Sequence, residues 1–289
     1  MSKLFRLVLW GAGGIGSLAG LVLLAFSVVA SPLYGLLGLI VSLLYVAGVL
    51  WALSRLPIWP HSPAGLKSRW WVVSALIWGA GATMLFVAPI GFAISDLAFR
   101  TGSTNAAAAW GGAYPEEIAK MVGVIVICLS FSQLNRPWHG LVVGAVIGLG
   151  FEAVENITYG AMGAMLDANS DWAGFWFTSG LRLVAGPCLH ILFTALAGWG
   201  VGLALFTANK SARWRWGHVL GWLFVAFALH FGWNYQFNND FLTIGSMVAV
   251  ALVLYPLAGI VIVRACRQAG ATPPVLITAG LPEAKGQPV

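Results

Sequence analysis

Six ionisable residues lie inside segments of the chain that otherwise have the composition of membrane-spanning helices, and a seventh lies near the end of another. A charge inside hydrocarbon is costly, so ionisable side chains in such segments indicate a functional site. Carboxylates and imidazoles together are the groups that proteins use for proton transfer and metal binding, so the set predicts chemistry rather than simple passage through lipid. The seven residues are Glu116, Glu117, Lys120, Glu152, Glu155, His190 and His230.

The spacing of these residues lets neighbours share one face of a helix, because residues three or four apart lie side by side. Lys120 follows Glu116 by four residues and Glu117 by three. Its ammonium can therefore pair with either carboxylate and hold it ionised against desolvation. The same spacing unites two further groups: Glu152 with Glu155 and Asn156, and His230 with Asn234.

The first carboxylate group also fits a purely structural role. Pro115 is a good first residue of a helix, and acidic residues suit the first turn. Glu116, Glu117 and Lys120 can thus be an ion-paired cap near the membrane surface. Both interpretations stay open at this point.

The remaining groups differ in how readily structure alone explains them. Glu152 and Glu155 lie deep in their segment with no cation beside them, which favours a functional role. His190 and His230, each taken alone, fit a hydrogen-bonded core histidine. Arg182 is either an anchor at the membrane surface or the cation that neutralises the acidic cluster.

Composition indicates that helices in a membrane must position these groups. The chain has 289 residues, of which 60% are hydrophobic and only 8% charged, whereas soluble domains carry about a quarter charged residues. A spanning helix needs about 20 mostly apolar residues. The predicted fold is therefore an all-α, polytopic bundle of about eight transmembrane helices, at about 7–30, 33–53, 70–95, 114–134, 139–163, 174–207, 217–235 and 241–263.

The sixth segment is too long for one straight crossing. Gly180, Gly186 and Pro187 predict a break, with an interfacial stretch followed by a span from about 187. We expect one integral membrane domain over 1–268, with the motif-bearing core at about 114–235, and a flexible cytoplasmic tail over 269–289. The three cysteines lack metal-type spacing and are expected to be small core residues: Cys128, Cys188 and Cys266.

The distribution of Lys and Arg predicts the orientation. With a cytoplasmic N-terminus, twelve cations fall in cytoplasmic segments and only Arg100 falls outside, so the formal net charge of +6 is a topology signal rather than a sign of nucleic-acid binding. Both termini are then cytoplasmic, and the 96–113 and 164–173 loops are outside. The protein is expected in the cell membrane. The cytoplasmic cations are Lys3, Arg6, Arg55, Lys67, Arg69, Arg136, Lys210, Arg213, Arg215, Arg264, Arg267 and Lys285.

This topology places the polar groups at one depth. Segments four to seven each bring their ionisable residues to the outer half of the bilayer, although the four segments are far apart in sequence. Unrelated structural residues would scatter in depth, so the clustering predicts one shared site.

At these residues the chain resembles the PrsW family of intramembrane proteases, within the wider superfamily of CAAX-prenyl proteases and bacteriocin-processing enzymes. Three motifs carry the resemblance: Glu-Glu-x-x-Lys at 116–120, Phe-Glu-x-x-Glu-Asn at 151–156, and two later histidines, His190 and His230. Lys120 and Glu155 favour the PrsW branch, since other branches have Arg and His there. The motifs span just under half of the chain.

The resemblance implies an integral membrane endopeptidase that cuts membrane-anchored proteins near the outer face. Such substrates are often anti-sigma factors or precursors.

Two other classes of protein remain open. A proton- or ion-coupled transporter would also place carboxylates and histidines in a bundle core, although no acidic motif repeats between the halves of this chain. A non-catalytic binding protein would not need every acid and histidine.

The residues support two mechanisms of peptide hydrolysis. In the first, His190, His230 and Glu152 hold a catalytic zinc, and Glu116 or Glu117 is the general base. In the second, Glu116 activates water without a metal, and Asn234 or a histidine faces the oxyanion. In both, Lys120 and Asn156 position carboxylates. The sequence does not decide between the two.

Overall fold

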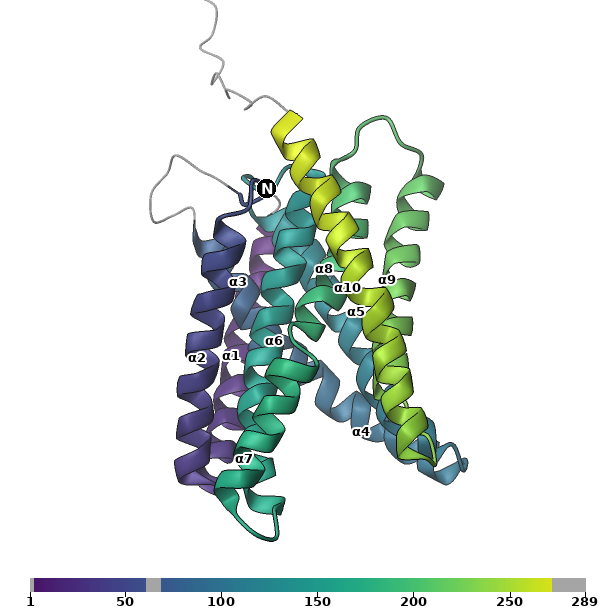
Figure 1. Ribbon diagram of the computed structural model, residues 1–289. Helices are drawn as coiled ribbons and strands as arrows, with labels where there is room; N and C mark the ends of the chain where they lie inside the picture. Colours follow the sequence, from purple (N-terminus) through teal and green to yellow (C-terminus); the bar gives the residue numbers. More distant parts are fainter. Residues whose placement is uncertain (1–2, 61–68, 272–289) are drawn as a thin grey trace, which may run out of the picture.

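The structure, a computed structural model, describes residues 3–60 and 69–271. All regular structure in these ranges is helical, which confirms the predicted all-α class. The helices form one elongated bundle (Figure 1). Chain order is α1 Lys3–Ala30, α2 Pro32–Ser54, α3 Trp70–Ile77, the π-helical turn η2 Trp78–Thr83, α4 Met84–Arg100, the 3-10 turn η3 Thr104–Ala106, α5 Ala107–Ser130, α6 Pro137–Leu166, α7 Asp171–Gly180, the π-helical turn η4 Leu181–Ala185, α8 Leu189–Phe206, α9 Ala212–Asn234 and α10 Asp240–Ala271.

Helices occur at all eight predicted segments. Within the described ranges, six stretches are long and apolar enough to span a membrane: α1, α2, α3 to α4, α6, α7 to α8, and α10. The other two, α5 and α9, are 24 and 23 residues long. They fall short in apolar composition, because α5 carries three charged residues and α9 carries two histidines and an asparagine. A multi-pass membrane protein is therefore established, and the count of eight spans stays a prediction.

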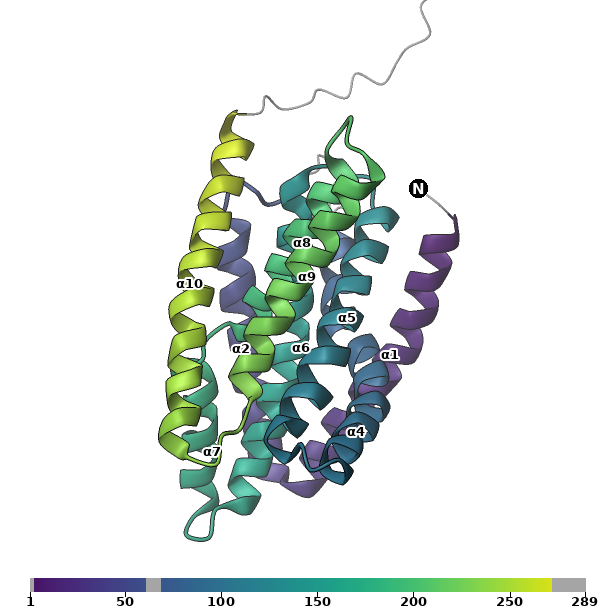
Figure 2. The same cartoon turned by 90° about the vertical axis from the view of Figure 1, so that its right-hand side faces the viewer.

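The bundle has one end to which several chain segments return. In Figure 1 the start of α1, the end of α10 and the connection between α8 and α9 all lie at the upper end. Turned by 90°, Figure 2 shows α1 and α10 at opposite edges of the bundle, with α5 and α9 between them. This arrangement is the one expected for an even number of crossings.

We predict that the upper end in Figure 1 is cytoplasmic, because the connection between α8 and α9 lies there. This connection and the start of α9 carry Lys210, Arg213 and Arg215. A cysteine introduced by Ala212→Cys should react with an impermeant thiol reagent only after the inner face is opened. One introduced by Ala168→Cys, in the exposed turn between α6 and α7, should react in intact cells. The reverse labelling pattern would show the orientation to be wrong.

Helix α6 is the centre of the bundle and packs against α2, α7 and α8. It is buried along most of its length, and its glycines let backbones approach closely, as small residues do between membrane helices. At Gly148 an added methyl group would collide with the backbone carbonyl of His190. Gly148 therefore fixes how closely the first turn of α8 lies to α6.

Three boundaries differ from the predictions. Helix α5 begins at Ala107, not near 114, because a run of four alanines is strongly helix-forming. Pro115 therefore lies inside a helix rather than at its start. The predicted break in the sixth segment occurs at η4 and the Gly186–Cys188 link, but α7 packs on α6 as part of the same crossing. Helix α10 runs to Ala271, so the predicted tail begins later, and its remaining residues, 272–289, lie outside the described ranges.

Candidate active site

Four helices bring the predicted polar residues together. Helix α5 supplies Glu116, Glu117 and Lys120, and α6 supplies Glu152, Glu155 and Asn156. The turn η4 and helix α8 add Arg182 and His190, and α9 adds His230 and Asn234. The structure thus gathers all ten predicted site residues in one region, although its contacts divide them into distinct groups.

Lys120 is fully buried among the carboxylates. Its Nζ lies 2.6 Å from Glu117 Oε1 and 3.2 Å from Glu116 Oε2. The ammonium also lies 4.4 Å from the centre of the Phe151 ring and 3.3 Å from His190 Nδ1. A cation removed from water in this way is stabilised by its paired charges, by its cation–π contact and by the nearby imidazole nitrogen.

His230 is held between a carboxylate and an amide. Its Nδ1 lies 3.0 Å from Glu117 Oε1, and its Nε2 lies 3.1 Å from Asn234 Nδ2. The ring stacks on Phe193 with 12° between the planes. In the neutral imidazole, Nδ1–H donates to Glu117 and Nε2 accepts from the amide. His230 and Asn234, which were predicted to share one helix face, therefore form a hydrogen-bonded pair.

His190 is oriented by a second carboxylate. Its Nε2 lies 2.8 Å from Glu155 Oε2, so the Nε2–H donates to that carboxylate and Nδ1 is left facing Lys120 and Glu116. Arg182 donates from Nη2 to Glu155 at 2.8 Å and from Nε to Asn156 Oδ1 at 2.6 Å. Of the two interpretations of Arg182, the structure therefore favours neutralisation of the acidic cluster.

Glu152 has a different environment from the one predicted. Its Oε2 accepts from the backbone N–H groups of His190 at 3.1 Å and Ile191 at 3.4 Å, at the start of α8. Its Oε1 accepts from the Tyr45 hydroxyl at 2.7 Å. A carboxylate suits this position, because it satisfies free backbone donors and the positive end of the helix dipole. Both oxygens of Glu152 thus accept hydrogen bonds from groups other than the two imidazole rings.

A cavity of about 920 Å³ opens beside these groups. Glu116 and both histidines line it, whereas Glu117 and Lys120 lie behind its wall. Much of the lining is apolar and comes from α4 and α10, for example Val87, Met247 and Val248. At Gly112 an added methyl group would lie 3.0 Å from Asn234 Nδ2, so glycine there leaves space beside the polar groups.

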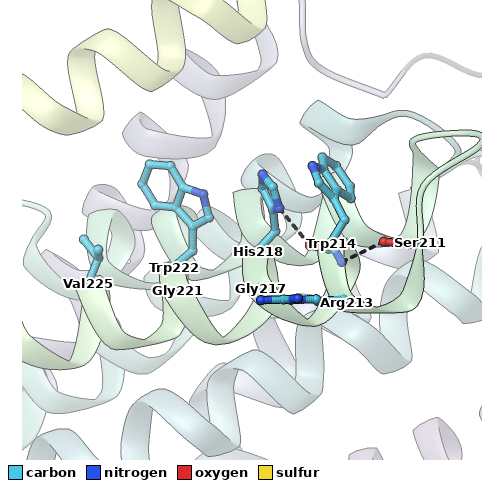
Figure 3. A pocket seen from close by; sticks show the side chains of 8 residues that line it. All are labelled: Ser211, Arg213, Trp214, Gly217, His218, Gly221, Trp222 and Val225. Carbon is cyan, nitrogen blue, oxygen red and sulfur yellow. Dashed lines mark hydrogen bonds between the residues drawn. The ribbon is translucent and has the colours of Figure 1, made fainter.

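A second hollow lies at the opposite end of α9 and differs in chemistry (Figure 3). Residues of α9 and its N-terminal cap line it, with His218 bonded to a carbonyl of its own helix. Among the residues that the structure describes, no carboxylate lines this hollow. The imidazole of His218 is therefore a matched comparison for the two site histidines.

The donor set fits a divalent metal ion. Glu116, Glu117, His190 and His230 each offer a ligand atom, and these atoms lie within 4.8 Å of one another. Glu117 Oε2 is buried and lacks a hydrogen-bond partner among the described residues. Counted as formal charges, four carboxylates meet the two cations Lys120 and Arg182 around the cavity, which leaves two negative charges. A divalent cation would balance them.

This set differs from the one predicted from sequence, in which Glu152 joined His190 and His230. The group whose ligand atoms lie together contains Glu116 and Glu117 but not Glu152, whose two oxygens accept from the first turn of α8 and from Tyr45. Sequence reasoning also missed Tyr45, which lies on a helix without any motif. Phe151 belongs to the motif at 151–156, but the sequence did not predict its contact with Lys120.

Comparison with known proteins gives a consistent result. A family model described as PrsW family intramembrane metalloprotease matches residues 67–261, more than half of the chain. The chain is 30% identical over 149 residues to a protein named Protease PrsW from Geobacillus kaustophilus (strain HTA426). That stretch is 51% of this chain and 60% of the relative. No solved structure matches the chain.

Proposed function

Because the chain belongs to the PrsW family of intramembrane metalloproteases, we propose that it is an endopeptidase that hydrolyses membrane-anchored proteins. The observation that carries the proposal is the cluster of Glu116, Glu117, His190 and His230 beside a cavity between the helices. Such groups cost free energy inside a membrane, and hydrolysis needs them there.

Glu116 is the general base in this proposal, because it is the member of the carboxylate pair that lines the cavity. It accepts a proton from the attacking water and passes it to the leaving amine. Lys120 holds the Glu116 carboxylate in place through an ion pair of 3.2 Å. Asn234 lines the cavity, and the amide hydrogen that it does not give to His230 can stabilise the oxyanion.

A metal ion would be held by His190, His230 and Glu117, whose Oε2 is unpartnered among the described residues. Two imidazoles and a carboxylate suit zinc, which we propose as the metal. When bound, the ion supplies Lewis-acid polarisation of the scissile carbonyl. Glu155 fixes the ring of His190 by accepting from its Nε2–H, as second-layer carboxylates do in metal sites.

We propose that the substrates carry a single transmembrane anchor and are cut near the outer face, with anti-sigma factors and precursors as the expected kinds. Glu116 follows the start of α5 by nine residues, and His230 precedes the end of α9 by four. The start of α5 and the end of α9 lie at the end of the bundle opposite the basic α8–α9 connection (Figure 1). Given cytoplasmic termini, the site then lies toward the outside.

The substrate is found by comparing new protein termini in membranes. Cells that express the wild type should accumulate cleaved termini of membrane-anchored proteins that are missing from cells expressing Glu116→Gln at equal abundance. Identical sets of termini in both strains would overturn the assignment.

A divalent metal should bind in one-to-one ratio to the purified chain. Chelation should abolish hydrolysis, and zinc should restore it. His190→Ala should lose both metal and activity, whereas His218→Ala, which alters the histidine of Figure 3, should retain both. Metal content is measured by mass spectrometry of the intact and chelated protein. Full activity after complete metal removal would support the metal-free use of Glu116.

A further inference from the structure

The link before α8 has an unusual backbone that must be held in place. Gly186 adopts φ −132° and ψ 59°, and Cys188 adopts the left-handed conformation with φ 61°. A residue other than glycine seldom occupies that region unless its surroundings impose it. His190 follows Cys188 by two residues, so the link determines where its ring lies.

Two tyrosines from different helices contact this link. Tyr45 on α2 donates its hydroxyl hydrogen to Glu152 Oε1 at 2.7 Å, and its oxygen lies 3.3 Å from Cys188 Sγ. Tyr255 on α10 donates to the backbone carbonyl of Pro187 at 2.9 Å. Together they contact two consecutive residues of the link, Pro187 and Cys188. Neither residue belongs to a motif that indicated the site.

Glu152 passes the restraint on to His190. One of its oxygens receives Tyr45, and the other receives the backbone N–H groups of His190 and Ile191. A chain of hydrogen bonds thus runs from α2 through α6 to the first turn of α8. At its end the His190 ring lies 2.8 Å from Glu155 and 3.6 Å from Glu116.

We propose that Tyr45 and Tyr255 are positioning residues that clamp the 186–188 link, so that His190 meets Glu116 and Glu155 in the reactive arrangement. The inference rests on the proposed protease function. It adds to that function two residues that, among the hydrogen bonds of the described residues, bond to neither Glu116 nor the histidine rings. Tyr45 also lies outside the residues 67–261 that the family model matches.

A merely structural role for Tyr45 would be ring packing between α2 and its neighbours. Tyr45→Phe keeps the ring and removes only the hydroxyl, so it separates the two roles. Tyr34→Phe is the matched control, because Tyr34 lies on the same helix and packs its ring on Phe175. The structure shows no hydrogen bond for the Tyr34 hydroxyl among the described residues.

The first measurement does not depend on activity. Hydrogen–deuterium exchange should accelerate in the first turn of α8, around residues 189–192, in Tyr45→Phe and in Tyr255→Phe. Exchange in Tyr34→Phe should match the wild type. Unchanged exchange at the start of α8 in both clamp variants would overturn the proposal, whether or not the protein hydrolyses any substrate.

The second measurement uses the membrane-anchored substrate found by terminus comparison. Tyr45→Phe should lower kcat by about 10- to 100-fold, with little change in KM. A loss of this size is usual when a group that orients a metal-site residue through a hydrogen bond is removed. A kcat equal to that of the wild type, in protein whose α8 exchange has increased, would also overturn the proposal. A wild type without activity would contradict the protease function instead, and the exchange result would then decide the clamp alone.

Discussion

Replacing Lys120 with methionine should destabilise the protein by about 3–5 kcal/mol, because one partner of a buried ion pair is lost and the other charges remain. The ammonium is within 3.2 Å of both Glu116 and Glu117 and has no exposed surface. Without it, two adjacent carboxylates in a low-dielectric interior repel each other. Hydrolysis should be lost as well, since this repulsion would displace the Glu116 carboxylate that Lys120 holds beside the cavity.

The effect is measured by unfolding in detergent, with Lys210→Met as the control. Lys210 is an exposed lysine near the ring of Trp214. Its replacement therefore measures the effect of removing a lysine charge that is not buried. We expect the control to unfold like the wild type. Equal stability of Lys120→Met and the wild type would contradict the ion-paired arrangement.

Glu116→Gln should reduce kcat by about 10²- to 10⁴-fold, the contribution of a general base, while the fold is retained. The amide keeps the size of the side chain but cannot accept a proton from water. Asp96→Asn is the matched control, because Asp96 forms an exposed ion pair with Arg100 on α4, away from the carboxylate–histidine cluster. Rates are compared on the same membrane-anchored substrate, with unfolding measured for both variants.

A Glu116→Gln variant that retains full activity would shift the base to Glu117. That outcome would conflict with the cavity, which exposes Glu116 and not Glu117. The two carboxylates are adjacent in sequence, yet their surroundings differ. This difference makes the two substitutions informative as a pair.

The gathering of the site was predictable because it depends on depth and on helical spacing. Lys120 lies one turn from Glu116, and the structure pairs them as the spacing requires. The pairing of His230 with Asn234 follows from the same rule. The distribution of Lys and Arg predicted the direction in which each helix crosses the membrane. Residues on different helices could therefore be assigned to one depth.

The partners of individual side chains were not predictable, because they depend on how helices pack sideways. Hydropathy says nothing about which face of α2 meets α6, so Tyr45 remained unnoticed. Glu152 was expected to bind metal, since a deep carboxylate without a neighbouring cation looks functional. Its role at the start of α8 depends on a break whose geometry only the fold determines.

Helix boundaries show a similar limit. Pro115 predicts a helix start when its surroundings are ignored, but the alanines before it extend α5 to Ala107. A proline inside a membrane helix is tolerated when neighbouring groups compensate for its missing donor. The charged and polar residues of α5 and α9 also lower their hydropathy, so the helices that carry most of the chemistry give the weakest spanning signal.

The most direct test of the central claim is hydrolysis by the purified chain. The protein is reconstituted in lipid vesicles with one single-span substrate, and the products are identified by mass spectrometry. We predict two fragments from one cut near the outer face with the wild type and with Asp96→Asn, and intact substrate with Glu116→Gln. An uncut substrate with purified wild type, although its cleavage in cells depends on Glu116, would show that another enzyme performs the reaction and would contradict this account.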